Sequence, residues 1–175
     1  MAVPTTADPA SGTGLLAAPF RSCPGRVRPE WIDHNGHMNL AYYVVLMDVA
    51  TDALWDAIGL GGAYQAATGC GTFAVETHTL YVGELREGED TGAASVVIGA
   101  DAKRLHVAHE LVKAADGAVS ARQELLYLNV DLSTRQVVPW RAETLARLLA
   151  AQDAHARVQP GWLGRRCAMP VPSPG

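Results

Sequence analysis

Residues 31–39, Trp-Ile-Asp-His-Asn-Gly-His-Met-Asn, form the densest group of reactive side chains in the sequence, with one carboxylate, two imidazoles and two amides. Asn39 is a preferred N-cap residue, and apolar positions follow helical spacing from Leu40 to Gly59. Backbone N–H groups at a helix N-terminus are unpaired and carry partial positive charge. We therefore expect the Asp33 carboxylate beside hydrogen-bond donors that could polarise a carbonyl group.

Hydrophobic periodicity predicts the helices and strands that surround this loop. We expect one curved antiparallel sheet, with its last four strands as a meander, wrapped around the long apolar helix in an α+β architecture. The glycine-rich residues 59–71 lack the Gly-Lys-Ser/Thr ending of a phosphate loop and are expected to be a connector. The remaining expected elements are a short or edge strand over Arg26–Ile32, strands over Thr72–Val82, Ala93–Ala100, Arg104–Ala114 and Val119–Val130, and a polar helix over Arg141–His155.

The length of 175 residues, with 49% hydrophobic positions, indicates one globular domain. Residues 1–22 are rich in Ala, Pro, Gly, Thr and Ser, and are expected to be a flexible arm. Residues 23–155 are expected to be the folded domain. Residues 156–175 are expected to be a loose tail because of their proline and glycine content.

Composition excludes several classes of partner and site. The net charge of −4, with scattered Lys and Arg, argues against nucleic acid or an anionic membrane as a partner. No apolar run reaches the ~20 residues of a membrane span, and the first residues lack a basic signal-peptide region. Three widely spaced cysteines indicate neither a disulfide framework nor a zinc site. We therefore expect a cytoplasmic protein without a bound metal.

The pattern Asp33-x-x-Gly36-His37-x-Asn39, followed by Tyr43, resembles the signature of hotdog-fold thioesterases of the 4-hydroxybenzoyl-CoA thioesterase type. This resemblance implies an antiparallel sheet around one long central helix. The wider stretch Pro29–Tyr43, together with Thr51–Leu54 and Lys103–His106, is similar to the betainyl-CoA thioesterase subgroup linked to carnitine breakdown.

The expected reaction is hydrolysis of a small acyl-CoA, with betainyl-CoA as the first substrate to test. Coenzyme A is then part of the substrate, and no separate cofactor is needed. Hotdog domains of this type usually pair with their active sites between subunits, so the resemblance also implies a homodimer or homotetramer.

In the resembled family the loop aspartate is catalytic, and this role transfers to Asp33 as either general base or nucleophile. The amides at the Leu40 helix start would bind the oxyanion, and Gly36 would allow close approach of the acyl group. The alternative for Asp33 is a capping or Asx-turn carboxylate, since Asp-His-Asn-Gly is also a good turn sequence.

Three further residues are candidate catalytic groups. His37 and Asn39 could orient Asp33 or the substrate, although a structural histidine and a plain N-cap are the alternatives. Asp48 is the reserve catalytic carboxylate because another branch of hotdog thioesterases places its carboxylate on this helix. The alternative for Asp48 is a place on a solvated face shared with Asp52 and Asp56.

A quaternary ammonium group offers no hydrogen bond and would be held by aromatic faces and carboxylates. Candidate faces are Trp31, Tyr42, Tyr43, Trp55, Phe73 and Tyr81, and candidate counter-charges are Asp48, Glu76 and Glu124. The alternative for the aromatic residues is packing in the core. Lys103 and Arg104, at a predicted turn, could meet the phosphates of coenzyme A, and a solvated pair of turn charges is the alternative for them. The expected substrate-binding set is Trp31, Asn35, Gly36, Leu40, Tyr43, Glu76, Lys103, Arg104 and Glu124.

Other functions stay open at this stage. The substrate could be another short or aromatic acyl-CoA, because pocket shape sets acyl specificity. Hotdog hydratases separate their Asp and His by four residues, whereas three residues separate Asp33 from His37. A non-catalytic acyl-CoA-binding hotdog protein and a structural dimer module are the remaining alternatives.

Overall fold

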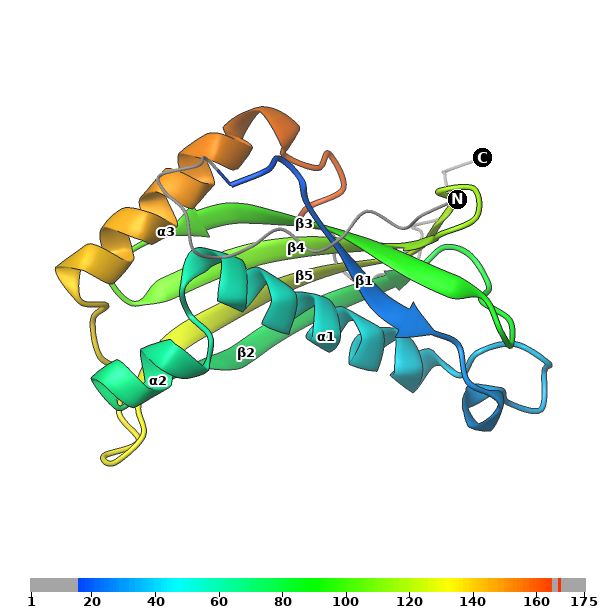
Figure 1. Ribbon diagram of the computed structural model, residues 1–175, viewed down its shortest axis with the longest axis horizontal. Coiled ribbons are helices and arrows are strands. Elements are labelled where there is room, and N and C mark those ends of the chain that lie inside the picture. The colour runs from blue at the N-terminus through cyan, green and yellow to red at the C-terminus, as the bar shows by residue number, and fades with distance from the viewer. Residues whose placement is uncertain (1–15, 165–166, 168–175) are drawn as a thin grey trace, which may run out of the picture.

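The computed structural model describes residues 16–164 and residue 167. A five-stranded antiparallel sheet has the order β1-β3-β4-β5-β2, and the long helix α1 crosses one of its faces (Figure 1). This architecture confirms the expected α+β hotdog fold. In chain order the elements are β1 (Phe20–Arg26), the 3₁₀ turn η1 (Pro29–Trp31), α1 (Leu40–Ile58), α2 (Gly62–Thr68), β2 (Cys70–Tyr81), β3 (Asp90–Ala100), β4 (Arg104–Lys113), β5 (Val119–Asp131), α3 (Ala142–His155) and the 3₁₀ turn η2 (Ala156–Val158).

Helix α1 begins and ends at the residues that the sequence predicts. Asn39 Oδ1 accepts the Ala41 N–H at 3.0 Å, which satisfies one donor that the helix itself leaves free. Gly59 follows the last turn with φ +74°, a left-handed conformation that glycine adopts at little cost. These local signals fix both ends of the helix.

The sheet covers one side of α1 in the single chain. Leu46, Met47, Ala50 and Leu54 are buried on that side, against the core formed with the sheet. The opposite side of the helix carries exposed apolar residues, namely Leu40, Val44, Val45 and Val49. A second molecular surface is needed to remove these side chains from water.

Strand β1 lies six residues earlier than predicted. The segment over Arg26–Ile32 is not a strand, because Pro29 begins a 3₁₀ turn that leads into the loop. The observed strand pairs with β3 and changes register between Ser22 and Gly25, so Pro24 is accommodated at a bulge of this edge strand. The strand starts at Phe20, inside the expected flexible arm, most of which lies outside the described residues.

Strand β2 does not pair with β3, so the predicted four-strand meander is wrong for its first strand. β3, β4 and β5 do form a meander, but β2 pairs with β5 along its length. Residues 82–89 therefore cross back from one edge of the sheet toward the other. On this path Leu85 O accepts the Met38 N–H at 2.7 Å, which brings the crossover to the loop before α1.

The remaining helices close the other end of the sheet. Residues 62–68 form the short helix α2 within the segment expected to be a plain connector. Helix α3 matches its predicted bounds and packs on β3. Its buried His155 accepts the Val97 N–H at 2.9 Å and contacts Ala17 O at 2.9 Å, which ties the N-terminal segment to the helix.

The segment after α3 returns across the outer face of the sheet. Trp162 Nε1 donates to Glu110 at 3.0 Å, and the Gly164 N–H donates to Glu124 at 2.7 Å. The expected loose tail is therefore held as far as Gly164, and most of its remainder lies outside the described residues. The helices of residues 16–164 are all too short or too polar to span a lipid bilayer.

Candidate active site

The loop before α1 is a tight turn. The Gly36 N–H donates to Asp33 O at 3.0 Å, and the Asp33 N–H donates to His37 O at 3.0 Å. Gly36 has φ +80°, which requires a residue without a β-carbon penalty. The Asn35 N–H donates to Asp33 Oδ1 at 2.8 Å, so Asp33 forms the Asx turn that was the alternative for this residue.

The Asx-turn bond also fixes the charge state of Asp33. The Asn35 amide holds the pKa of the Asp33 carboxyl below its ordinary value, with a smaller contribution from His37, against the opposing effect of desolvation. The Asp33 side chain is 16% exposed. An ionised, largely covered carboxylate can act as a nucleophile or as a general base at neutral pH.

Asp33 lines a cavity of about 480 Å³ between the loop, the start of α1 and the end of β2. Leu40, the first residue of α1, lines the same cavity. The first free amides of the helix are partly used, because Asn39 accepts the N–H groups of Ala41 and Tyr42. Among the described residues nothing accepts the Leu40 N–H. One cavity is thus lined by Asp33 and by the residue whose N–H is free at the helix start.

Two tyrosines form a fixed wall of this cavity. The buried Tyr43 hydroxyl donates to Gly83 O at 3.2 Å and accepts the Leu85 N–H at 2.9 Å. Tyr81 packs edge-on against Tyr43, with ring centroids 5.3 Å apart and an interplanar angle of 86°. The Tyr81 hydroxyl donates to Leu40 O at 3.3 Å. These bonds hold both rings in place before any ligand binds.

His37 and Asn39 differ in their relation to the cavity. His37 lines it, with Nδ1 3.8 Å from Asp33 Oδ1 and 3.3 Å from Met38 O. Asn39 caps α1 and is not among the residues that line the cavity. Asn39 therefore acts on the site through the position of the helix start. Asn35 and Gly36 belong to the turn, and Asn35 also lines the cavity.

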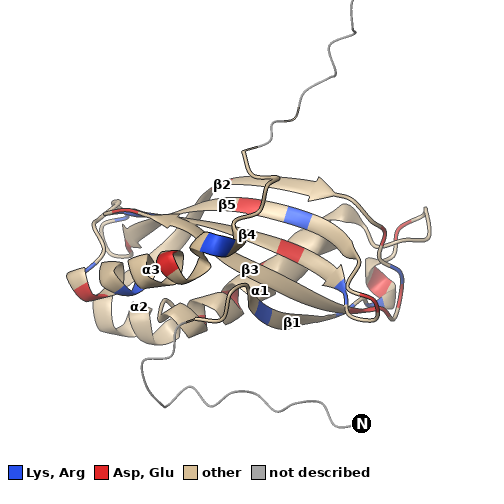
Figure 2. Ribbon diagram, turned by 90° about the horizontal axis from the view of Figure 1, so that it is seen from above, with Lys and Arg blue, Asp and Glu red and all other residues tan. Residues whose placement is uncertain are grey.

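Three of the predicted carboxylates lie elsewhere. Asp48 lies on the exposed side of α1. Gln123 and Leu125 are buried on the core face of β5, so Glu124 between them points to the outer face of the sheet. There Glu76 and Glu124 line a separate hollow of about 380 Å³. Figure 2 shows the charged positions that β4 and β5 carry on this side of the molecule.

The outer-face hollow contains a short contact between an imidazole and a carboxylate. His106 Nε2 lies 2.8 Å from Glu124 Oε1, and His78 also lines the hollow.

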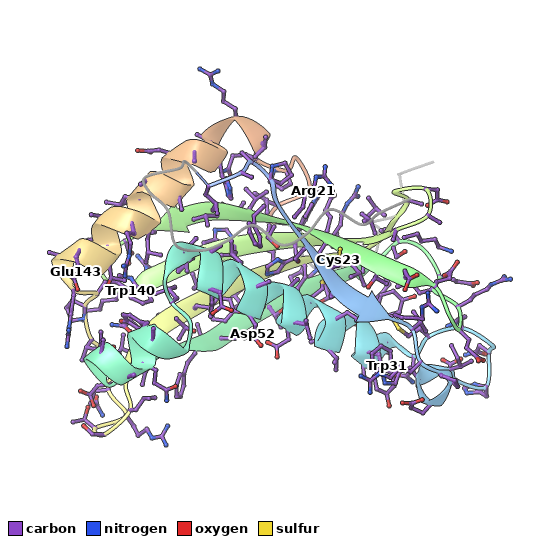
Figure 3. The ribbon with its side chains drawn as sticks, viewed as in Figure 1. Arg21, Cys23, Trp31, Asp52, Trp140 and Glu143 are labelled. Atoms are coloured by element: carbon purple, nitrogen blue, oxygen red, sulfur yellow. The ribbon has the colours of Figure 1, made fainter. Side chains whose placement is uncertain are left out.

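Asp52, on the same side of α1 as Asp48, lies near the middle of the helix (Figure 3). Desolvation together with Asp48 and Asp56 raises the pKa of Asp52. The single chain brings none of these groups to Asp33.

The remaining predicted binding residues also lie outside the Asp33 cavity. Lys103 and Arg104 follow the β3–β4 turn, at the opposite end of the sheet from the loop before α1 (Figure 1). Arg104 is paired with Asp101 at 2.6 Å. Trp31, beside the start of α1 (Figure 3), stacks on Tyr42 with centroids 5.0 Å apart. Its ring supports the loop from outside.

The crossover contributes three cavity residues that were not predicted as site residues, namely Val82, Gly83 and Glu84. Tyr81, at the end of β2 and predicted as a candidate aromatic face, lines the cavity beside them. In the sequence, Glu84 lies between the expected strands Thr72–Val82 and Ala93–Ala100, where the expected meander would have placed a hairpin. The actual pairing of β2 with β5 sends this segment past the start of α1.

Comparisons with known proteins agree with this geometry. The family model of the thioesterase-like superfamily matches residues 27–148. A betainyl-CoA thioesterase of Pseudomonas aeruginosa is 36% identical over 145 residues, which are 82% of this chain and 91% of that protein. An L-carnitine dehydrogenase/betainyl-CoA thioesterase of Rhizobium meliloti is 34% identical over 85% of this chain, but this match spans 30% of that longer protein.

Solved structures show the same fold. A Staphylococcus aureus protein in complex with CoA is 25% identical and superposes with a TM-score of 0.78, over 91% of this chain and all of that chain. A structure from Pseudomonas putida KT2440 is 32% identical and has a TM-score of 0.71 over the same shares. Residues 27–148, which the family model matches, include the loop before α1, the residues that line the Asp33 cavity and strands β2 to β5. The chain therefore belongs to the thioesterase-like superfamily and is a thioester hydrolase with the hotdog fold.

Proposed function

We propose that this protein hydrolyses betainyl-CoA to betaine and coenzyme A. The observation that carries the proposal is the shared cavity, which is lined by the ionised Asp33 and by Leu40, the residue with the free N–H at the helix start. The names of the Pseudomonas aeruginosa and Rhizobium meliloti relatives support betainyl-CoA as the substrate. Coenzyme A enters as part of this substrate, so the reaction needs no further cofactor.

The Leu40 N–H donates to the thioester carbonyl oxygen, which gains negative charge as the carbonyl carbon is attacked. In one route Asp33 attacks, the C–S bond breaks, and water then hydrolyses the mixed anhydride to betaine and the free carboxylate. In the other route Asp33 accepts a proton from the water that attacks directly. Label on Asp33 after a single turnover in ¹⁸O-labelled water, detected by mass spectrometry of the protein, would establish the first route, since only attack of water on the Asp33 carbon of the anhydride places the label there.

The substitution Asp33→Asn tests the proposal. We expect the rate of thiol release from betainyl-CoA to fall by about 10²-fold or more, because the amide can neither attack nor accept the proton. The matched control is Asp116→Asn, since Asp116 also accepts a backbone N–H two residues on, from Ala118 at 2.9 Å, in a remote turn. Full activity of a folded Asp33→Asn protein would contradict the catalytic role and favour the Asx-turn role alone.

The proposed active unit is a homodimer paired along β2. Strand β2 is an edge of the sheet, and apolar side chains near it are exposed, among them Phe73, Val75 and Val82. Helix α1 also exposes apolar side chains, among them Val44, Val45 and Val49. A long apolar edge strand invites pairing with another strand, and a second copy satisfies both strands through one two-fold axis.

Antiparallel pairing of two β2 strands would place the Cys70 end of one strand beside the Tyr81 end of the other. The Asp33 cavity lies at the Tyr81 end, so the second subunit would complete its open side. Lys103 and Arg104 lie toward the Cys70 end of β2, because β4 pairs with β5 and β5 pairs with β2 in this register. In the dimer they would approach the neighbouring cavity, where they could meet the phosphates of coenzyme A.

We also propose a cytoplasmic location. The three cysteines, Cys23, Cys70 and Cys167, are free. Free thiols are typical of a reducing compartment. A reporter fusion fractionated into cytoplasmic and periplasmic extracts would check this location.

A further inference from the structure

The Asp33 cavity is acidic. Asp33 and Glu84 both line it, and none of the described residues that line it is lysine or arginine. A neutral acyl group would need only the Asp33 carboxylate for hydrolysis. A second carboxylate in the same cavity attracts a positively charged acyl group and repels an anionic one.

Glu84 is available to a ligand. Its only ion pair among the described residues is with Arg86, at 3.9 Å, and both side chains are exposed. Exposed pairs at this distance contribute little, so a bound cation would compete with Arg86 at small cost. Glu124 does not meet this condition, because it is bound to His106 and Gly164 on the outer face. Asp48 and Glu76 do not line the Asp33 cavity.

An aromatic surface lies beside Glu84 in the cavity. The Tyr81 side chain is 46% exposed, and its hydroxyl bond to Leu40 O holds the ring beside the start of α1. Quaternary ammonium groups bind against tyrosine faces because the ring quadrupole attracts the cation without a hydrogen bond. An immobile ring loses little entropy on binding.

In the proposed substrate the ammonium group and the thioester carbonyl are close enough that both must lie in the same cavity. In betainyl-CoA a single CH₂ group separates the ammonium nitrogen from the thioester carbonyl carbon. The group that recognises the cation must therefore share the cavity with the catalytic carboxylate and the Leu40 N–H. Among the described residues, Glu84 is the other carboxylate that lines this cavity with Asp33.

We infer that Glu84, with the ring of Tyr81, forms the subsite that selects a quaternary ammonium acyl group. This inference rests on the proposed thioesterase function and names the substrate class of the same site. Glu84 acts here as a specificity residue, and the bond-making steps remain with Asp33 and the Leu40 amide.

The test compares two substrates of the same shape. 3,3-Dimethylbutyryl-CoA replaces the ammonium nitrogen of betainyl-CoA by carbon, so the two acyl groups differ in charge and hardly in size. The measured quantity is the ratio of kcat/KM for betainyl-CoA to kcat/KM for the neutral analogue. Taking this ratio relative to wild type cancels the intrinsic difference in thioester reactivity and any general damage to the protein.

In Glu84→Gln we expect this ratio to fall by about 10-fold to 100-fold, because the amide keeps the size of the side chain and loses its charge. Tyr81→Leu is expected to lower the ratio by about 3-fold to 30-fold. The control is Glu87→Gln, an exposed glutamate of the same crossover that does not line the cavity, which should leave the ratio unchanged. A Glu84→Gln ratio within about 2-fold of wild type would overturn the inference.

Failure of the proposed function gives a different result. A folded wild-type protein that releases thiol from neither substrate would refute hydrolysis of these thioesters. Calorimetric titration of Asp33→Asn and of the Asp33→Asn/Glu84→Gln double variant with both thioesters then measures the subsite without turnover. Preference for betainyl-CoA that is lost with Glu84→Gln supports the subsite, and equal affinities in both variants overturn it.

Discussion

At the level of single residues, Asp33 combines a structural bond with a reactive position. The Asn35 N–H occupies Oδ1 and keeps the carboxyl ionised, while the side chain still lines the cavity. The turn and the catalytic role are therefore compatible, because a carboxylate has lone pairs to spare on both oxygens.

His109 is a buried residue of a different kind. Its Nδ1 lies 2.8 Å from Ser95 Oγ and its Nε2 lies 3.1 Å from Thr51 Oγ1, in the core under α1. Burial lowers the pKa of His109 from 6.5 to about 4. The imidazole is therefore neutral in the folded protein at pH values where it is protonated in the unfolded chain.

The free energy of unfolding should fall as the pH drops from about 7 to about 5. The unfolded chain binds a proton on His109 near pH 6.5, whereas the folded protein does not until about pH 4. The folded protein loses stability because the unfolded state takes up more protons across this interval. The expected decrease in the free energy of unfolding is about 2 kcal/mol. Urea titrations at a series of pH values measure it.

The variant His109→Gln serves as the control for this pH effect. It lacks the titrating group, so its stability, whatever its absolute value, should depend less on pH between about 5 and 7. An identical pH dependence in wild type and His109→Gln would show that other groups cause the change.

At the level of elements, the ends of the helices depend on single residues. Gly59 ends α1 in the left-handed region, and a β-carbon there would lie 3.1 Å from Arg147 Cζ. Gly62 is the first residue of α2, without a positive φ, and a β-carbon there would meet open space. The fold therefore needs glycine at position 59 and does not need it at position 62.

We expect Gly59→Ala to destabilise the protein by about 1 kcal/mol or more, and Gly62→Ala to be neutral or slightly stabilising. The first change forces alanine into a strained conformation. The second only reduces the freedom of the unfolded chain. Denaturant unfolding of both variants gives the comparison, and an equal loss in both would contradict the assignment of strain to Gly59.

At the level of the whole molecule, apolar side chains of α1 and of the edge strand β2 are exposed in the single chain. The Asp33 cavity lies between the start of α1 and the end of β2. A homodimer along β2 would cover the apolar side chains and complete the cavity in the same step. Assembly and activity are therefore expected to change together.

Val45→Lys should convert the protein to a monomer and lower its thioesterase activity. The charged side chain would be buried in the interface without a partner. Light scattering coupled to gel filtration distinguishes the 18.5 kDa chain from a pair. The matched control is Leu149→Lys, because Leu149 is exposed to a similar degree, 40% against 46% for Val45, but lies on α3.

Dimeric Leu149→Lys with full activity is the expected control result. A wild-type protein that elutes as a monomer at assay concentration, and is active, would refute the dimeric site. A Val45→Lys protein that stays dimeric would place the interface on another surface.

Local sequence was sufficient to predict the loop of residues 31–39, the limits of α1 and α3, the four long strands and the place of Asp33. These features depend on interactions between residues close in the chain. An N-cap bonds two or three residues on, a helix repeats every 3.6 residues, and the Asx turn of Asp33 closes within the loop itself.

The partners of β1 and β2, and the faces to which side chains point, came only from the tertiary structure. A strand pattern does not say which edge it will pair with, so the crossover that brings Glu84 to Asp33 was not visible in the sequence. A bulge near Val75 shifts the register of β2, and the face of β5 that packs on α1 decides that Glu124 points outward. Distances between residues far apart in the chain are set by packing, and the composition of the cavity follows from those distances.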